Sequence, residues 1–458
     1  MKHALCYIAI LIFSIYSHNV YADNINLNIQ KTSTQNNVHY LYVEHHDLPA
    51  ISLRFAFKKA GYAYDTLDKQ GLAHFTSQIL QKGSEDNNEL DFTTQLDSKG
   101  IELKFEVDEE NFYISLKTLS ENLEEALSLL SGCIFNPITD SEIFNRVKHE
   151  KIANIKALYT SPTFIAATEL NHAIFKGHPY SNKIYGTLHT LNNIEPKDIP
   201  LYIQNSFDKD QVVISATGDL DSVKLSALLD KYLLSNLPSG NNKNTIPNTT
   251  VNKEQKLLYV HRNIPQSVIM FATDTVPYNH QEYYASNLFN TILGGLTLNS
   301  ILMLELRDKL GLTYYSGSSL LNMEHGNVLL GIITTDNSTV TKCISVLTDI
   351  LENIKNQGID EKIFSIAKSN IMNSFILSLL SNDNIASTLL DLQIRGLDPS
   401  YINKYNSHYG AITIKEVNKI AQEILSNELV IIEVGKNNNI NGEEIHTKQN
   451  ILGKHYNL

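Results

Sequence analysis

The chain has 458 residues, of which 42% are hydrophobic and 19% are charged, and it contains no Trp. This composition excludes a disordered chain, a collagen-like fibre and a disulfide-stapled miniprotein, and the length suffices for two or three domains that each bury a core. The 37 Lys and Arg against 49 Asp and Glu give a net charge of −12. Nucleic acid is therefore not expected as a partner, because its backbone is itself an anion.

The first 22 residues have the pattern of a secretory signal peptide. A basic residue precedes an apolar run over residues 4–16, and Val20 and Ala22 stand at the −3 and −1 positions before Asp23. The run is shorter than the roughly 20 residues of a membrane-spanning helix, and no later segment reaches that length without charges. We therefore expect a periplasmic or otherwise secreted chain without a membrane span.

One pattern of elements occurs twice along the chain. Residues 48–52 and 264–268 each open a strand-like stretch, 216 residues apart, and three further pairs of segments have offsets within a few residues of this value. These pairs are residues 98–101 with 309–312, 138–144 with 358–364, and 212–218 with 430–435. Four matches at similar offsets indicate a duplicated domain.

The duplication divides the mature chain into two domains. We expect the first domain at residues 23–234 and the second at 257–436, joined by a linker at 235–256 that is rich in Asn, Pro, Ser, Gly and Thr. The polar tail, residues 437–458, is expected to be frayed.

In each half the sequence predicts two strands, a helix pair, two strands, further helices and a closing strand. Residues 51–57 alternate between apolar and polar or small side chains, which indicates a strand with one buried face, and residues 101–107 and 112–116 alternate in the same way. Helices are expected from residue 123 and over residues 144–158. The order of elements predicts an α+β fold in which helices cover one face of a largely antiparallel sheet in each half.

A helix predicted from Gly71 to Gly83 carries polar side chains at a functional spacing. His74, Ser77 and Gln78 stand at positions i, i+3 and i+4, which share one face of a helix. Here the chain resembles the pitrilysin or insulinase family of zinc peptidases, and more closely its mitochondrial-processing-peptidase-like branch. The resemblance implies a clamshell of two homologous halves. It also implies a His-x-x-Glu-His motif on this helix, in which two His bind zinc and the Glu activates a bound water.

This sequence departs from that motif at two of its three positions. His74 matches the first zinc ligand, but Ser77 replaces the Glu and Gln78 replaces the second His. The resemblance places the third ligand, a Glu, near Asn154. A catalytic zinc site needs three protein ligands and an open position for water, which one imidazole cannot supply. We therefore predict a degenerate zinc site, with no metal bound by this chain and no peptide hydrolysis by this chain alone.

Other candidate catalytic or metal sites are less convincing. His149 begins a second zinc-peptidase pattern, but Ala153 occupies the place of its second His, so His149 is interpreted as a surface residue. Residues 45–47, His-His-Asp, would need a turn to face one metal, because neighbours in a strand point to opposite faces. Cys133 and Cys343 have no local catalytic signature and make no disulfide framework.

The second half keeps a different part of the family pattern. Gly294 and Gly295 match a glycine turn, and residues 306–314 match Leu-Arg-x-x-x-Gly-Leu-x-Tyr with Arg307 and Tyr314 in place. In two-chain enzymes of the family, one subunit carries zinc and the other supplies this Arg/Tyr pair to hold the substrate backbone. A structural alternative is that the Arg caps helix carbonyls, the Tyr packs under the sheet, and the glycines form a tight turn between helices.

The resemblance therefore implies a non-catalytic, substrate-binding subunit of a periplasmic zinc peptidase. It would form a heterodimer with a paralogous chain that carries the zinc, and the pair would act on a peptide substrate. The alternative is a peptide-binding or scaffolding module without any role in hydrolysis, as in processing-peptidase-like subunits of respiratory complexes.

Overall fold

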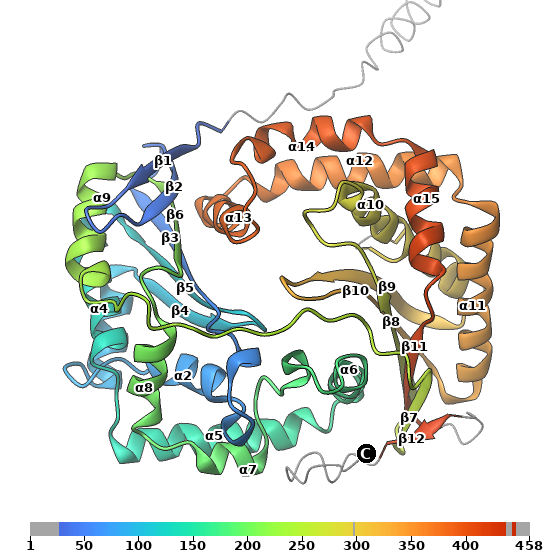
Figure 1. Cartoon of the computed structure of the whole chain (residues 1–458), viewed down its shortest axis with the longest axis horizontal. Helices are drawn as coiled ribbons and strands as arrows, with labels where there is room; N and C mark the ends of the chain where they lie inside the picture. Colours follow the sequence, from blue (N-terminus) through green and yellow to red (C-terminus); the bar gives the residue numbers. More distant parts are fainter. Residues whose placement is uncertain (1–26, 296–297, 437–441, 446–458) are drawn as a thin grey trace, which may run out of the picture.

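The computed structural model describes residues 27–295, 298–436 and 442–445. The predicted signal peptide and most of the predicted polar tail lie outside these residues. The described chain contains two six-stranded sheets that face each other, with helices packed on their outer sides and between them (Figure 1). This arrangement confirms the predicted α+β class with two similar halves.

The first sheet has the strand order β1-β2-β6-β3-β5-β4, and its neighbouring strands are antiparallel except β2 and β6. Its strands are β1 (Gln30–Ser33), β2 (His39–Glu44), β3 (Ala50–Lys58), β4 (Glu102–Val107), β5 (Asn111–Leu119) and β6 (Val212–Gly218). The longer helices of this half are α2 (Leu72–Leu80), α3 (Glu89–Lys99), α4 (Leu123–Phe135), α5 (Ser141–Leu158), α6 (Pro162–Ile174), α7 (Leu188–Asn193), α8 (Asp198–Ser206) and α9 (Ser222–Leu229). Shorter helical turns are η1 (Tyr62–Tyr64), η2 (Leu67–Lys69), η3 (Ser120–Asn122), η4 (Pro179–Ser181) and η5 (Asp230–Leu234).

The second sheet has the order β12-β7-β11-β8-β10-β9, with β7 parallel to both β11 and β12. Its strands are β7 (Leu257–His261), β8 (Gln266–Asp274), β9 (Thr313–Asn322), β10 (Asn327–Asp336), β11 (Val430–Gly435) and β12 (Glu443–Glu444). Its helices are α10 (Tyr283–Leu293), η6 (Met303–Lys309), η7 (Asn337–Thr339), α11 (Val340–Gln357), α12 (Glu361–Ser378), α13 (Asn382–Ile394), α14 (Ser400–Ala411) and α15 (Ile414–Leu425).

The two halves repeat one another strand by strand. β3 and β8 each have nine residues, occupy the same place in their sheets and pair with equivalent neighbours. Two details differ from the expected pattern. β1 adds a strand at the start of the first half, and β12 extends the second sheet where the sequence analysis expected a frayed tail.

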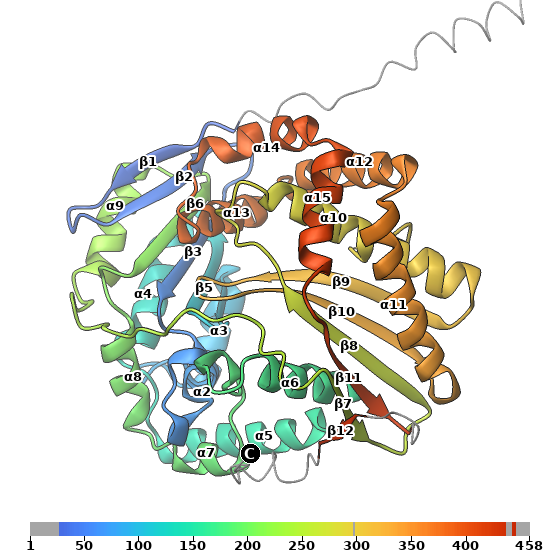
Figure 2. The same ribbon diagram turned by 45° about the vertical axis from the view of Figure 1, so that its right-hand side comes forward.

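Each half also contributes one helix to the sheet of the other half. α13 packs on β3 and β6 of the first sheet, and α6 packs on β8 and β11 of the second sheet (Figure 2). As a result, the central residues of β3 are buried on both faces, which differs from the half-buried strand that its alternation predicted. The inner face of β3 is covered by a helix that lies more than 300 residues further along the chain.

Polar contacts fix α13 on the first sheet. The Asp383 carboxylate accepts hydrogen bonds from Arg54 at 2.6 Å and pairs with Lys117 at 3.2 Å. The hydroxyl of Ser215 donates to the carbonyl of Ala386 at 2.6 Å, and both residues are fully buried. These contacts attach α13, a helix of the second half, to the sheet of the first half.

The connection between the halves, residues 235–256, contains no helix or strand and crosses from one sheet to the other (Figure 1). The buried side-chain amide of Asn242 donates to the carbonyls of Lys58 and Ser206, at 3.2 and 3.1 Å. Further along, the amide of Thr249 donates to the carbonyl of His325 at 2.7 Å. The connection is thus hydrogen-bonded to both halves.

The tips of two hairpins meet between the sheets. The β4–β5 turn carries Asp108, Glu109 and Glu110, and the β9–β10 turn carries Glu324. The Glu110 carboxylate accepts hydrogen bonds from the Tyr180 hydroxyl and from the amide of Glu324, the latter at 2.8 Å. Burial raises the pKa of Glu110 to about 7, against the opposing effect of the Tyr180 hydrogen bond.

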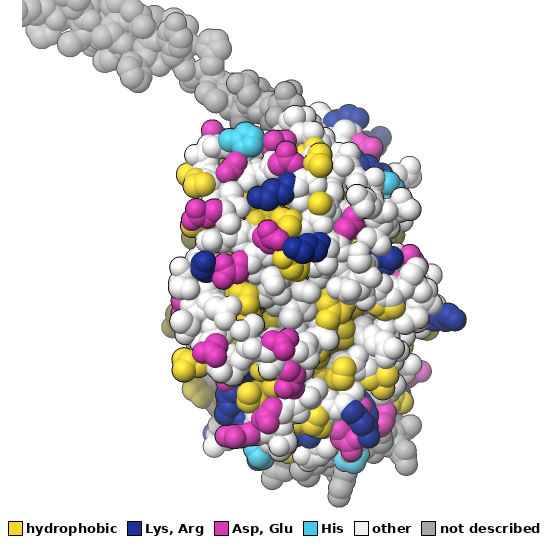
Figure 3. Space-filling model, turned by 90° about the vertical axis from the view of Figure 1, so that its left-hand side faces the viewer, with side chains coloured by type: hydrophobic (Ala, Val, Ile, Leu, Met, Phe, Trp, Pro, Cys, Tyr) yellow, Lys and Arg dark blue, Asp and Glu magenta, His cyan; other side chains and the backbone are white. Residues whose placement is uncertain are grey.

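The surface carries charges of both signs. On the face shown in Figure 3, which is the outer side of the first half, acidic and basic side chains are interspersed.

Among the described helices, no single one is long and apolar enough to cross a membrane. Helices α12 and α13 reach that length and apolar content only as a pair, which is bent by 112°.

Candidate functional site

Helix α2 begins at a fixed point because a buried carboxylate caps it. Asp65 accepts hydrogen bonds from the amides of Gly71 at 2.8 Å and Ala73 at 3.1 Å, which satisfies donors that the first turn of a helix leaves unpaired. Gly71 has φ +92°, and a Cβ atom there would lie 2.7 Å from the backbone of Gly186. The start of α2 therefore requires glycine, and it fixes the position of His74 three residues later.

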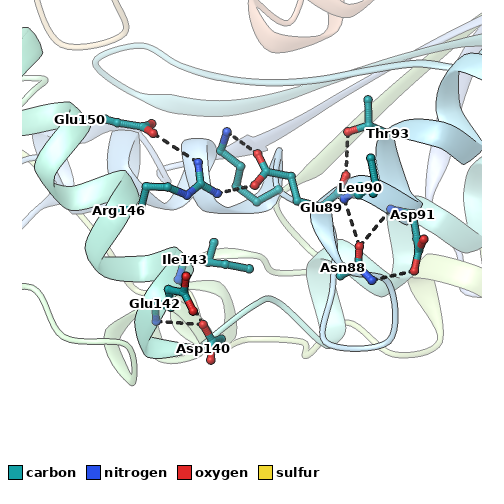
Figure 4. A network of polar contacts seen from close by, with 11 residues as sticks. Asn88, Glu89, Leu90, Asp91, Thr93, Asp140, Glu142, Ile143, Arg146 and Glu150 are labelled. Carbon is teal, nitrogen blue, oxygen red and sulfur yellow. Dashed lines mark hydrogen bonds and ion pairs between the residues drawn. The ribbon is translucent and has the colours of Figure 1, made fainter.

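Helix α5 is held beside α2 by a network of ion pairs (Figure 4). Glu89, in the first turn of α3, accepts from Lys82 at 2.9 Å and also pairs with Arg146 of α5. Arg146 reaches Glu150, one turn further along α5, at 3.3 Å. Asp140 caps the start of α5 through hydrogen bonds from two backbone amides. Three helices are thereby joined around one cluster of charges.

Three of the four predicted residues of the degenerate zinc site meet in one pocket of about 490 Å³ between α2 and α5. Its wall includes His74, Gln78 and Asn154, as the resemblance implied, and also Lys151 and Tyr185. The Lys151 ammonium donates a hydrogen bond to Oε1 of Gln78 at 2.8 Å. A lysine thus stands among the side chains that replace the zinc ligands.

His74 is a neutral imidazole in this pocket. Burial, followed by the nearby charge of Lys151, lowers the pKa of His74 to about 4. Its ring makes an edge-to-face contact with Tyr185, with 4.7 Å between the ring centroids and an interplanar angle of 85°. At neutral pH the imidazole therefore contributes ring packing without charge.

Ser77, in the position of the family's catalytic Glu, does not face the pocket. It is fully buried, and its hydroxyl donates to the carbonyl of His74 at 2.8 Å, within the same helix. It is absent from the pocket wall. A serine hydroxyl that is engaged in this way cannot activate a water in the pocket.

The donors in this pocket do not fit a zinc ion. Zinc sites in proteins use imidazole nitrogens, thiolates and carboxylates, whereas this pocket offers one imidazole and the amides of Gln78 and Asn154. The Lys151 ammonium would repel a metal cation at this place. Throughout the described residues there is no group of three or more His, Cys, Asp or Glu side chains that could hold a metal ion.

Lys151 was not among the residues expected at this site, although the sequence contained a signal for it. Lys151 precedes Asn154 by three residues on a predicted helix, and residues at this spacing share a face. A zinc motif directs attention to residue types that can bind zinc, whereas lysine carries a positive charge.

Arg307 lies on the π-helical segment η6, which ends just before β9. Its neighbour Leu306 is fully buried, whereas Arg307 itself is exposed. Within the described part of the chain, the guanidinium makes no hydrogen bond or ion pair; only the backbone carbonyl of Arg307 is engaged, by the amide of Gly311 at 2.9 Å. Arg307 does not cap the helix through its side chain.

Tyr314 lies at a β-bulge in the edge strand β9. The pairing with β10 places Tyr315 opposite Thr334 and Thr313 opposite Thr335, so Tyr314 is the extra residue between them. Its side chain is 82% exposed. Tyr314 therefore does not pack under the sheet, and the two structural roles considered for the Arg/Tyr pair are absent in the described chain.

Gly294 ends α10 at a close contact with β9, in the connection that leads to the next helix. Its carbonyl accepts a hydrogen bond from the amide of Ser318 at 2.8 Å, and a Cβ atom on Gly294 would lie 2.4 Å from that same nitrogen. The glycine thus lets the helix end touch the strand that carries Tyr314. Gly295 follows it and precedes residues 296–297, which lie outside the described chain.

The structure does not bring the Arg/Tyr pair and the degenerate zinc site together. Tyr314 is seven residues from Leu321 on the same strand, and Leu321 contacts a cavity beside α6. At about 3.3 Å per residue, this separation is roughly 20 Å along β9. Neither Arg307 nor Tyr314 lines the pocket that contains His74.

The other histidines considered in the sequence, His45, His46 and His149, form no shared site. His45 contacts the side chain of Asn382 at 2.6 Å, whereas His46 contacts Asp219 at 2.6 Å, so the two rings have different partners. His149 is exposed on α5, as predicted. Both described cysteines are buried free thiols, and burial raises the pKa of each.

Comparisons with known proteins identify the family. Residues 32–188 match the model described as insulinase, peptidase family M16, and residues 193–371 match the model described as the peptidase M16 inactive domain. Together these segments span both halves of the fold. The chain belongs to peptidase family M16.

Individual relatives are distant. A Helicobacter pylori protein named non-peptidase homolog YmxG is 25% identical over 84% of this chain and 88% of its own length. A Bacillus subtilis protein named uncharacterized zinc protease YmxG is 21% identical over 83% of this chain and 92% of its own. A solved Pseudomonas fluorescens structure, described as a peptidase M16 inactive domain, has a TM-score of 0.83 and 23% identity over 89% of this chain and 98% of its own.

Proposed function

We propose that this chain is a non-catalytic, peptide-binding subunit of a periplasmic zinc peptidase, in which Arg307 and Tyr314 hold the substrate of a zinc-bearing partner chain. The observation that carries this proposal is the exposure of both side chains without intramolecular partners, at two irregular positions of the backbone. π-Helical segments and β-bulges occur frequently at functional sites, where they redirect a side chain.

The chemistry of the two side chains suits peptide recognition. A guanidinium presents five donors in a fixed geometry and can bind carbonyl or carboxylate oxygens, and a phenol can donate to a scissile carbonyl. Because β9 is an edge strand, an extended peptide or a partner segment also finds unpaired backbone groups beside Tyr314.

The pocket at His74 supports a role without hydrolysis by this chain. It lacks the donors for zinc, and Ser77 cannot serve as a general base. The name of the Helicobacter pylori relative, a non-peptidase homolog, is consistent with this reading. A Candida albicans chain of complex III2, with a TM-score of 0.76, shows that this fold occurs inside a multisubunit assembly.

The test is Arg307→Ala in the complex with a zinc-bearing M16 chain from the same organism. We expect at least a tenfold loss of kcat/KM for peptide cleavage, while co-purification and the melting temperature stay unchanged. Lys309→Ala, on the same segment, is the matched control, because the exposed side chain of Lys309 pairs with Glu305 of that segment. Loss of pairing or a melting temperature several degrees lower would show that Arg307 is structural. An unchanged rate in both Arg307→Ala and Tyr314→Phe would favour the scaffolding alternative.

A further inference from the structure

The ammonium of Lys151 lacks a balancing acid. Within the described residues its one side-chain hydrogen bond goes to the neutral amide of Gln78, and no carboxylate lies within ion-pair distance. The nearest acids on these helices are already engaged, since Glu150 pairs with Arg146 and Glu89 pairs with Lys82 and Arg146. Lys151 is about half buried, and an ammonium has three donors, of which one is used.

The rest of the pocket wall is uncharged and combines polar with apolar side chains. Ile155, Ala157 and Leu158 are apolar, and His74 is neutral at neutral pH. The exposed amide of Asn154 makes no hydrogen bond to another described residue. A singly charged carboxylate matches one ammonium and one amide donor. A phosphate, with nearly two negative charges, would leave part of its charge unbalanced here.

A second cavity of about 420 Å³ adjoins this pocket and shares Ile155 and Tyr185 with it. It lies where α6 meets the second sheet, and its wall is mostly apolar. The apolar side chains include Tyr159, Phe164, Leu170 and Ile174 from the first half and Met270, Leu321 and Leu330 from the second. Lys183 also lines it, and its ammonium donates to the hydroxyl of Tyr159 at 3.3 Å.

We propose that these adjoining cavities bind the C-terminal end of a peptide, with the α-carboxylate at Lys151 and an apolar terminal side chain in the cavity beside α6. The lysine then supplies, at the place of the lost metal, a positive charge that recognises a carboxylate. This proposal deepens the proposed function by naming the class of peptide that the chain holds, and it rests on that function only in assuming a peptide ligand.

The test uses the isolated mature chain and a peptide that carries the only Trp, since the protein has none. Acetyl-Trp-Ala-Ala-Leu with a free carboxylate is compared with its C-terminal carboxamide by Trp fluorescence titration. Hydrogen bonds to charged groups contribute enough that we expect the free acid to bind at least tenfold more tightly. Lys151→Met should abolish this preference, and Lys151→Arg should retain it.

Lys156→Met is the matched control, because Lys156 is exposed on the same helix and does not line either cavity. Equal binding of acid and carboxamide to the unmodified chain would overturn the proposal, and so would a preference that persists in Lys151→Met. Circular dichroism checks folding, and Lys151→Gln replaces the Met variant if the latter unfolds.

A further arm distinguishes the source of the carboxylate. Decanoate carries the same group on an acyl chain, and binding of decanoate without binding of the peptide acid would overturn the assignment to a peptide. This assay reports binding by the isolated chain, whereas the Arg307 test reports cleavage by the complex. Either proposal, the carboxylate site at Lys151 or the role of Arg307, can therefore fail while the other holds.

Discussion

Single side chains decide the chemistry of the pocket between α2 and α5. The loss of two of the three motif positions was evident in the sequence, because Ser77 and Gln78 are residue types that cannot replace a general base and a zinc ligand. The orientation of Ser77 was not evident, since it depends on how α2 is rotated against the sheet. The presence of Lys151 beside His74 depends on the packing of α5 on α2, which joins residues that lie 77 positions apart.

The first prediction concerns restoration of the zinc site. We expect that Ser77→Glu, Gln78→His and Asn154→Glu together will bind little zinc, because the Lys151 ammonium remains beside the new ligands. Adding Lys151→Ala should raise the bound zinc measurably. The measurement is elemental analysis after dialysis against a weak chelator.

The control for this series is His74→Ala in the fourfold variant, which should remove any zinc that was gained. Equal zinc contents with and without Lys151 would contradict the role given to its charge. One tightly bound zinc ion in the unmodified chain would contradict the conclusion that this pocket does not bind zinc.

At the level of elements, the sequence predicted the repeated order and several strands and helices of the first half, but not their irregularities. The bulge at Tyr314 results from the register of β9 with β10 and is not visible in the sequence of a single strand. Likewise, Gly294 suggested a turn because glycine is common there, but the position requires glycine because α10 ends against β9.

The second prediction tests that contact. Gly294→Ala should lower the free energy of unfolding by about 1–3 kcal/mol, because its methyl group would meet the backbone of Ser318 and must displace β9. Chemical denaturation measures the change. Gly410→Ala is the control: it lies in α14 with nothing within 4 Å of the added Cβ, so it should stabilise the chain by about 0.5–1 kcal/mol. Similar effects of both substitutions would contradict the requirement at Gly294.

The third prediction concerns the attachment of α13 to the first sheet. Asp383→Ala should destabilise the chain by about 1–3 kcal/mol, because it leaves the half-buried charge of Arg54 without its acid and removes one of the two acids that pair with Lys117. Asp349→Ala, on the exposed side of α11, should change stability by less than about 0.5 kcal/mol. The measurement is thermal denaturation of both variants. An Asp383→Ala variant with unchanged stability would show that apolar packing alone holds α13 on the sheet.

For the whole molecule, the duplication and the fold class could be predicted because each half repeats its own local pattern. The exchange of α6 and α13 could not be predicted in this way. Neither helix has a strongly one-sided apolar pattern, and the sheet on which each packs is not determined by local sequence. The alternation in β3 therefore predicted one buried face, since nothing nearby in the sequence indicates the helix that covers the other.

The fourth prediction concerns the pH dependence of the contact between the hairpin tips. The pKa of Glu110 is raised to about 7 in the folded chain, so its contribution to stability is full below the unfolded value near 4.5 and is lost as the pH rises through 7. The unfolding free energy should fall by about 1–3 kcal/mol between pH 5 and pH 8 relative to Glu110→Gln. Asp108, Glu109 and Glu324 remain in both proteins, so the difference isolates Glu110. Parallel pH profiles would contradict this contribution.

The exchanged helices also constrain how the chain is made. The inner face of the first sheet is complete only when α13 has left the ribosome, and α13 begins 164 residues after the end of β6. At about 5–20 residues per second, the nascent first half would expose that apolar face for roughly 10–30 s. Such a delay would offer a chaperone a defined binding surface, and ribosome-bound fragments that end before residue 382 should crosslink to holdases more strongly than fragments that end after residue 394.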